Sequence, residues 1–105
     1  MSRVMKNNII VIALLALSVG ISHAQSSVDS GRKIFETNCT KCHGSAGDKG
    51  RFGAKDLTIS RLQIEAAKQI IQNGKNIMPA WGKRLSSSEI DQVIKYIVTL
   101  RRRVE

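Results

Sequence analysis

The sequence predicts one small all-α domain, with roughly three main helices joined by loops and preceded by a cleavable signal peptide. Two observations carry the fold class: apolar residues recur at helical spacing in three stretches, and no stretch alternates as a strand does. A third observation, a charged and then apolar beginning, separates a leader from the folded part. We therefore expect helices and loops only.

The first residues have the layout of a secretory signal peptide. Arg3 and Lys6 precede an apolar run over residues 9–21, and Ser22-His23-Ala24 places small residues where a signal peptidase reads them. The run has 13 residues, whereas a membrane-spanning helix needs about 20, so an uncleaved anchor is the weaker alternative. No cysteine follows the run directly, so a lipid anchor is not expected. Export to the periplasm is the prediction.

Removal of a signal peptide over residues 1–24 would leave a domain over residues 25–105. This domain has 81 residues, and so small a core needs a staple or a cofactor. Its two cysteines are separated by only two residues, and a disulfide closing such a short loop would stabilise the fold weakly. The domain keeps 15 basic and 8 acidic residues, a net charge of +7, with one histidine, His43, and one methionine, Met78. A cofactor is the expected stabiliser.

The first helix is expected over residues 28–38. Ser26 and Asp29 have the spacing of a capping box, with Asp in place of the usual Glu or Gln. The apolar face holds Val28, Gly31, Ile34 and Phe35. Because glycine weakens a helix, we expect Gly31 to serve the close approach of another backbone.

The second helix is expected over residues 61–73. Ser60 and Gln63 have the spacing of a start signal, and Gly74 follows as a C-terminal stop. The apolar face consists of Ile64, Ala67, Ile70 and Ile71. This helix is therefore expected to bury one face in the same core.

The third helix has the clearest signals. Ser86 and Glu89 form a capping box, and Leu85 and Ile90 occupy the two positions of a hydrophobic staple. A core-facing stripe follows at Ile90, Val93, Ile94, Ile97 and Leu100. The arginines at 101–103 would end the helix, where positive charge suits the helix dipole.

The chemistry lies in the segment Cys39-Thr40-Lys41-Cys42-His43, a C-x-x-C-H haem-attachment signature. Two thiols on one helical turn can add to the two vinyl groups of one porphyrin, and the adjacent histidine then lies beneath the iron. A thioredoxin-like pair would need a βαβ setting, which is not visible. Structural zinc would need four ligands, and the mature domain has three cysteine or histidine residues. One haem c, attached through two thioethers, is the prediction.

Met78 is the candidate sixth ligand of the iron. No second histidine remains in the mature domain, and Met78 lies 35 residues after His43 and directly before Pro79, the single proline. Proline stiffens its own backbone and extends the residue before it, so the loop can hold a thioether toward the iron. The alternative is that Met78 is an ordinary core residue. The sixth position of the iron would then hold a lysine or water, or stay open.

These motifs together resemble the class I c-type cytochromes, most closely the small soluble mono-haem proteins of bacterial and photosynthetic electron transfer. The resemblance covers essentially all of residues 25–105 and is carried by Gly31, Phe35, Cys39–His43 with Gly44, Ile70-x-x-x-Gly74, Met78-Pro79-Ala80-Trp81 and Tyr96. It implies a small cytochrome c fold in which Gly31 and Phe35 cross Tyr96 and Ile97. Relatives place Gly-Pro where this chain has Gly53-Ala54, so the carbonyl that orients His43 is left open.

An iron with both axial positions filled by protein passes one electron with little rearrangement. We therefore expect an electron carrier that is not an enzyme and that shuttles between membrane-bound or periplasmic redox partners. The alternative is a haem-based sensor or gas-binding module with a displaceable Met78. A peroxidase-like enzyme is disfavoured because the mature domain offers no distal histidine.

The basic charge points to partners with acidic docking surfaces. Lys41, Lys75, Lys83 and Arg84 lie close in sequence to the haem ligands and are expected around the haem edge, while the arginines at 101–103 are expected to be a solvated helix end. Trp81, Arg51 and Lys55 are weaker candidates to face a haem edge or propionate, and the two charged residues more simply belong to a solvated loop. We expect a monomer that binds no nucleic acid and meets membranes only through partner complexes.

Overall fold

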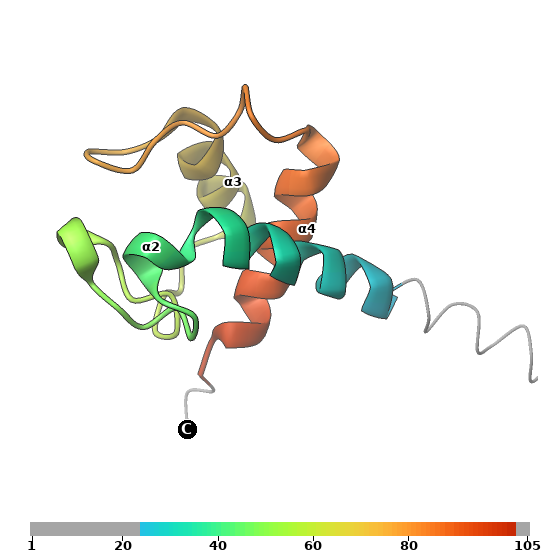
Figure 1. The fold of residues 1–105 in the computed structure, drawn as a ribbon, viewed down its shortest axis with the longest axis horizontal. Helices are drawn as coiled ribbons and strands as arrows, with labels where there is room; N and C mark the ends of the chain where they lie inside the picture. The colour runs from blue at the N-terminus through green and yellow to red at the C-terminus, as the bar shows by residue number, and fades with distance from the viewer. Residues whose placement is uncertain (1–23, 103–105) are drawn as a thin grey trace, which may run out of the picture.

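The computed structural model describes residues 24–102, which form helices and loops (Figure 1). Residues 24–38 are helical, and they are followed by α2 (Thr40–His43), the 3₁₀ turn η1 (Arg51–Gly53), α3 (Ile64–Asn73) and α4 (Ser87–Leu100). The described residues contain no strand, only an isolated bridge between Lys75 and Met78. The all-α prediction is confirmed. The predicted signal peptide, except Ala24, lies outside the described residues.

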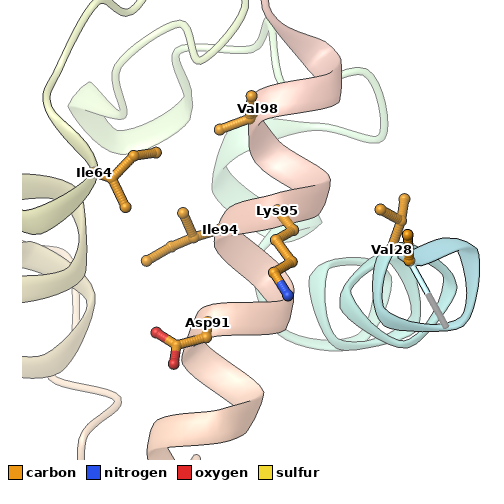
Figure 2. A pocket seen from close by; sticks show the side chains of 7 residues that line it. Val28, Ile64, Asp91, Ile94, Lys95 and Val98 are labelled. Atoms are coloured by element: carbon orange, nitrogen blue, oxygen red, sulfur yellow. The ribbon is translucent and has the colours of Figure 1, made fainter. Parts of the chain in front are cut away.

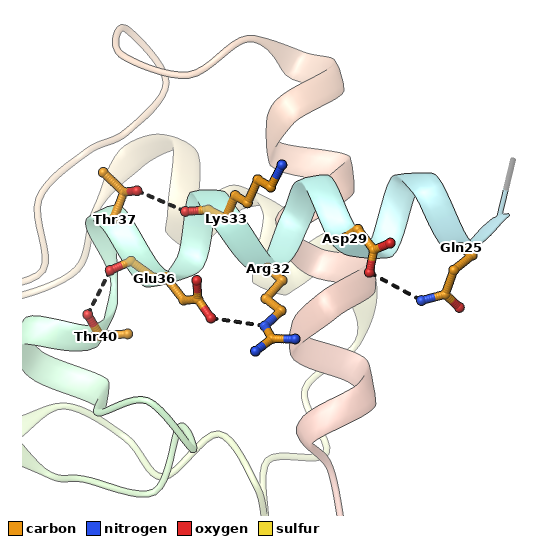
Figure 3. A network of polar contacts seen from close by, with 7 residues as sticks. All are labelled: Gln25, Asp29, Arg32, Lys33, Glu36, Thr37 and Thr40. Atoms are coloured by element: carbon orange, nitrogen blue, oxygen red, sulfur yellow. Dashed lines mark hydrogen bonds and ion pairs between the residues drawn. The ribbon is translucent and has the colours of Figure 1, made fainter. Parts of the chain in front are cut away.

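The first helix begins earlier than its predicted capping box. Ser26 and Asp29 both lie inside the helix, which already includes Ala24, so the predicted start is wrong. Residues 24 and 25 are already helical, so Ser26 does not cap the helix. The Asp29 carboxylate accepts a side-chain hydrogen bond from Gln25 at 3.2 Å. Along the same exposed face Arg32 pairs with Glu36 at 2.9 Å (Figure 3). Such pairs one turn apart support a helix that extends beyond its apolar stripe.

The core forms where this helix crosses α4 (Figure 1). A Cβ at Gly31 would overlap the Gln92 carbonyl oxygen, so the prediction of a close backbone approach is confirmed. One turn further, the ring centroids of Phe35 and Tyr96 lie 5.3 Å apart, as the resemblance implied. Phe35 is fully buried together with Ile90 and Val93. The glycine therefore lets two helices meet around an aromatic pair.

The second helix begins three residues later than predicted. Its N-cap is Gln63, whose side chain makes no capping bond, and the Ser60 hydroxyl accepts from the Leu62 backbone N–H at 3.3 Å. The Leu62 carbonyl accepts from the Arg101 guanidinium at 2.9 Å instead of entering a helical turn. The end is as predicted: α3 stops at Gly74, with φ +76° and its N–H donating to the Ile70 carbonyl. A residue 39 positions away in sequence thus bonds to the loop just before the start of the helix.

The signals of α4 are confirmed. The Glu89 N–H donates to the Ser86 hydroxyl at 3.1 Å, and the Ser86 N–H donates to the Glu89 carboxylate at 3.0 Å. Ile90, Val93 and Ile94 of the predicted stripe are buried, and Leu85 packs against them. Within residues 24–102, no helix is long and apolar enough to cross a membrane.

Candidate haem site

The two cysteines lie at the junction between the first helix and α2. The Cys39 N–H still donates to the Phe35 carbonyl at 2.9 Å, and the Cys39 carbonyl accepts from the His43 N–H at 3.0 Å. Cys39, Cys42 and His43 therefore occupy a single turn of backbone. Both thiols are free. Burial, together with the neighbouring Cys42, raises the pKa of the Cys39 thiol to about 11, so this thiol is protonated at neutral pH in the chain without its cofactor.

The imidazole of His43 is oriented by a backbone carbonyl. Its Nδ1 lies 3.0 Å from the carbonyl oxygen of Lys55. Because a carbonyl only accepts, this bond requires the proton on Nδ1 and leaves the lone pair of Nε2 free for a metal. The structure thus supplies the carbonyl that the sequence left open. The Lys55 side chain itself is exposed.

The loop between α2 and α3 folds back on the haem motif. The Lys49 N–H donates to the His43 carbonyl at 2.9 Å, and the Leu57 N–H donates to the Gly47 carbonyl at 2.8 Å. Phe52 has φ +56° and is 65% exposed, a left-handed backbone that bulky residues rarely adopt. This loop therefore carries the Lys55 carbonyl on one side and an exposed aromatic ring on the other.

Met78 lies in a second loop, which is tied to the end of α3. The Met78 N–H donates to the Lys75 carbonyl at 3.0 Å, and the Lys75 N–H donates to the Met78 carbonyl at 3.2 Å. Between them Asn76 has φ +55°, which asparagine tolerates in tight turns. The Trp81 N–H then donates to the Ile71 carbonyl at 2.8 Å. Hydrogen bonds on both sides of Met78 therefore hold its backbone in place.

The two loops fit an apolar, planar cofactor. Four of the exposed large apolar side chains lie in them, namely Phe52, Ile59, Leu62 and Ile77. In Figure 1 both loops extend to the same side of the α3–α4 pair, next to α2. Exposed apolar side chains near two free thiols are consistent with a surface that a bound ligand covers. A porphyrin would cover apolar surface, take both thiols and offer its iron to an imidazole and a thioether.

Some of the predicted site residues meet at the core, whereas Cys42 and His43 are not among the residues packed against it. Cys39, Met78 and Trp81 all pack against its buried cluster. Arg84 lies over the Trp81 ring, 5.2 Å from its centroid. Arg51 is exposed and donates to the Lys41 carbonyl at 3.4 Å, in keeping with a residue of a solvated loop.

A separate hollow lies between the first helix, α3 and α4 (Figure 2). It measures about 590 Å³, and its lining is Ala24, Val28, Ile64, Asp91, Ile94, Lys95 and Val98. Asp91 already pairs with Lys68 at 3.0 Å. This lining offers no thiol, imidazole or thioether. Across residues 24–102, no three metal-ligating side chains converge as structural zinc would require.

The sequence left the identity of the Lys55 carbonyl open, because a backbone carbonyl has no side-chain signature. It missed Arg101, which is half-buried and donates to the Leu62 carbonyl, so its predicted place on a solvated helix end is wrong. Nothing in the sequence distinguishes Arg101 from its neighbours, because it stands in a run of three arginines.

Comparison with known proteins agrees with this geometry. Residues 26–97 match the protein family described as cytochrome C oxidase, cbb3-type, subunit III. The chain is 35% identical to cytochrome c6 of Gracilaria tenuistipitata var. liui over 79 residues, 70% of this chain and 72% of the relative. It is 32% identical to cytochrome c6 of Synechococcus sp. over 97 residues, 86% and 87% of the two chains. The corresponding protein of Gloeothece citriformis is 32% identical over 104 residues, 93% and 94% of the two chains.

The matched region contains both cysteines, the histidine beside them and the two loops that extend next to α2. A helical fold, paired thiols on one turn and relatives along most of the chain agree with one another. The chain belongs to the class I c-type cytochromes, small one-electron carriers that hold one haem c through two thioethers.

Proposed function

We propose that His43 and Met78 are the two axial ligands of the haem iron and that the protein is a carrier rather than an enzyme. The observation that carries this proposal is that hydrogen bonds hold the His43 ring and the Met78 backbone. His43 is held by the Lys55 carbonyl at 3.0 Å, and the Met78 backbone is held by its paired hydrogen bonds with Lys75. When bound, the haem supplies the one-electron chemistry of its iron. An iron held by both of these residues would pass one electron with little rearrangement and would offer no position to a substrate.

The ligand proposal is tested by replacing the thioether. Met78→Ala should open the iron to carbon monoxide or cyanide and lower the reduction potential, while Met78→His should keep a low-spin iron but also lower the potential. Ile77→Ala, in the same turn and 73% exposed, is the matched control and should keep the low-spin spectrum. An unchanged spectrum and potential in Met78→Ala would assign the sixth position to another group. Ready binding of carbon monoxide by the unaltered protein would favour a gas-binding module instead.

The electron carrier meets its redox partners through a basic surface. Lys41 lies on α2, while Lys75, Lys83 and Arg84 lie in the loop that holds Met78, and all four side chains are exposed. With a mature net charge of +7, they favour acidic docking surfaces. Redox encounters bury little area, so charge acts mainly on the rate of encounter. Such transient docking suits a monomer.

Salt dependence tests this docking surface. Electron transfer to the physiological partner should slow as salt rises to physiological strength, where the screening length is about 8 Å. Lys75→Glu with Lys83→Glu should slow transfer at low salt and flatten the salt dependence. Lys95→Glu makes the same charge change as either single replacement, at the hollow between α3, α4 and the first helix. It is the control, and it should slow transfer less than Lys75→Glu or Lys83→Glu alone. A rate indifferent to ionic strength would contradict electrostatic docking.

We also propose that the protein is exported to the periplasm. A charged start, an apolar run over residues 9–21 and small residues up to Ala24 support export and cleavage. The mature chain would then begin at Gln25 in the periplasm, where its partners are membrane-bound or soluble redox proteins. Intact mass of the protein from the periplasmic fraction tests this, because an uncleaved leader adds the mass of 24 residues.

A further inference from the structure

The C-terminal end of α4 is bonded to the loop that precedes α3. The Arg101 guanidinium donates to the Leu62 carbonyl at 2.9 Å, and the Arg102 backbone N–H donates to the Thr58 carbonyl at 2.7 Å. From the loop, the Arg61 guanidinium donates to the Arg102 carbonyl at 2.7 Å. We call these three bonds the C-terminal clamp. Each joins segments about 40 residues apart in sequence.

The clamp holds the segment that carries the orienting carbonyl of His43. Lys55 lies three residues before Thr58, and residues 54–63 contain no helix or strand. Apart from the clamp, the Leu57 N–H donates to the Gly47 carbonyl and the Ala54 N–H to the Arg51 carbonyl, Leu57 packs against the core, and Thr58 is buried. A loop without regular structure opens more easily when long-range bonds are lost. The position of the Lys55 carbonyl therefore depends in part on bonds made at the far end of the chain.

Arg101 occupies this position at a cost. Its side chain is half-buried, and its Nε is buried without a hydrogen-bond partner. Leaving a buried donor unsatisfied is unfavourable, and arginine is rarely buried without a paired acid. Its neighbour Arg102, by contrast, is exposed and contributes to the clamp through its backbone alone. The distinction between the two arginines points to a specific task for Arg101.

We propose that Arg61 and Arg101 are positioning residues for the proximal histidine: they fix residues 58–62 and thereby hold the Lys55 carbonyl against Nδ1 of His43. The inference rests on the proposed ligand role of His43. A hydrogen bond at Nδ1 raises the basicity of the imidazole and fixes its orientation at the metal. The arginines therefore act on the iron through the loop, without touching the cofactor.

Exchange of the His43 Nδ1 proton with solvent, followed by NMR in the reduced haem-loaded protein, tests the clamp. Arg101→Ala should speed this exchange by about tenfold or more, the factor expected when a hydrogen bond from a charged group no longer resists local opening. Arg61→Ala should act in the same direction, and it carries the test alone if Arg101→Ala fails to fold. Arg101→Lys should restore part of the protection.

Arg102→Ala is the matched control, because it removes the same charge at the next residue and keeps the clamping N–H. Its exchange rate should equal that of the unaltered protein, and the reduction potential of Arg101→Ala should lie above that of Arg102→Ala, since a less basic imidazole stabilises ferric iron less. Equal rates or equal potentials in the two variants would overturn the proposal. So would a parallel acceleration at the Val93 amide in the core, which indicates global destabilisation.

The readout also separates this proposal from the ligand assignment. A His43 ring bound to the iron gives proton signals displaced far from their ordinary positions by the haem ring current. Ordinary ring shifts would refute the ligand role itself, whereas displaced shifts with unaltered exchange in Arg61→Ala and Arg101→Ala would refute only the clamp.

Discussion

A single methyl group at Gly31 tests the helix crossing on which the site is built. A Cβ at this position would overlap the Gln92 carbonyl oxygen and lie 3.1 Å from the Val93 nitrogen. Both atoms belong to the backbone of α4, so neither can rotate away, and the two helices must separate. The helix that contains Gly31 leads directly into Cys39, so the displacement reaches the haem motif.

The expected loss of stability follows from two opposing effects. Overpacking of a well-packed core costs about 1–3 kcal/mol, and contacts with the backbone of α4, which cannot rotate away, place Gly31→Ala at the upper end. Alanine returns about 1 kcal/mol through its better helix propensity. The net loss is about 2 kcal/mol, which lowers the Tm of a domain of this size by about 10 °C.

Thermal and guanidinium unfolding of the haem-loaded protein, followed by circular dichroism, measure this loss. Gly50→Ala is the control, because the nearest atom to its Cβ would be the Ala54 carbonyl oxygen at 3.4 Å, and the backbone φ of −101° suits alanine. Its stability should stay near that of the unaltered protein. If Gly31→Ala proved as stable as Gly50→Ala, the reasoning from the close approach to Gln92 would be refuted.

Three further outcomes are expected. Haem should stay with the polypeptide on acid–acetone extraction and be released only when both Cys39 and Cys42 are replaced by alanine; free haem from the unaltered protein would contradict thioether attachment. Ser86→Ala should cost about 1 kcal/mol in guanidinium unfolding, the usual value of an N-cap, and no loss would argue against the capping box. The Thr58 hydroxyl and amide donate to Asp56 and hold the pKa of that carboxyl below its usual range. Asp56 therefore contributes stability above about pH 4, which is lost as the pH falls through its lowered folded pKa. Thr58→Val should raise that pKa in an NMR titration, and an unchanged value would refute this cause.

The local signals of this sequence were sufficient wherever neighbours along the chain make the structure. The capping box at Ser86 acts within one turn, and the stop at Gly74 depends on the φ of a single residue. The spacing of Cys39, Cys42 and His43 likewise places all three on one turn, because α2 is built from that segment alone. These features could be predicted from the sequence because each depends on only a few consecutive residues.

The tertiary structure decided what depends on distant segments. The choice of the Lys55 carbonyl as the partner of His43 has no side-chain signature, because every residue carries a carbonyl. The late start of α3 and the half-buried position of Arg101 come together at the hydrogen bond from Arg101 to Leu62, which joins residues 39 apart. Periodicity and capping rules describe the chain within a few turns, so they cannot foresee a bond that forms only after α4 has packed against the loop.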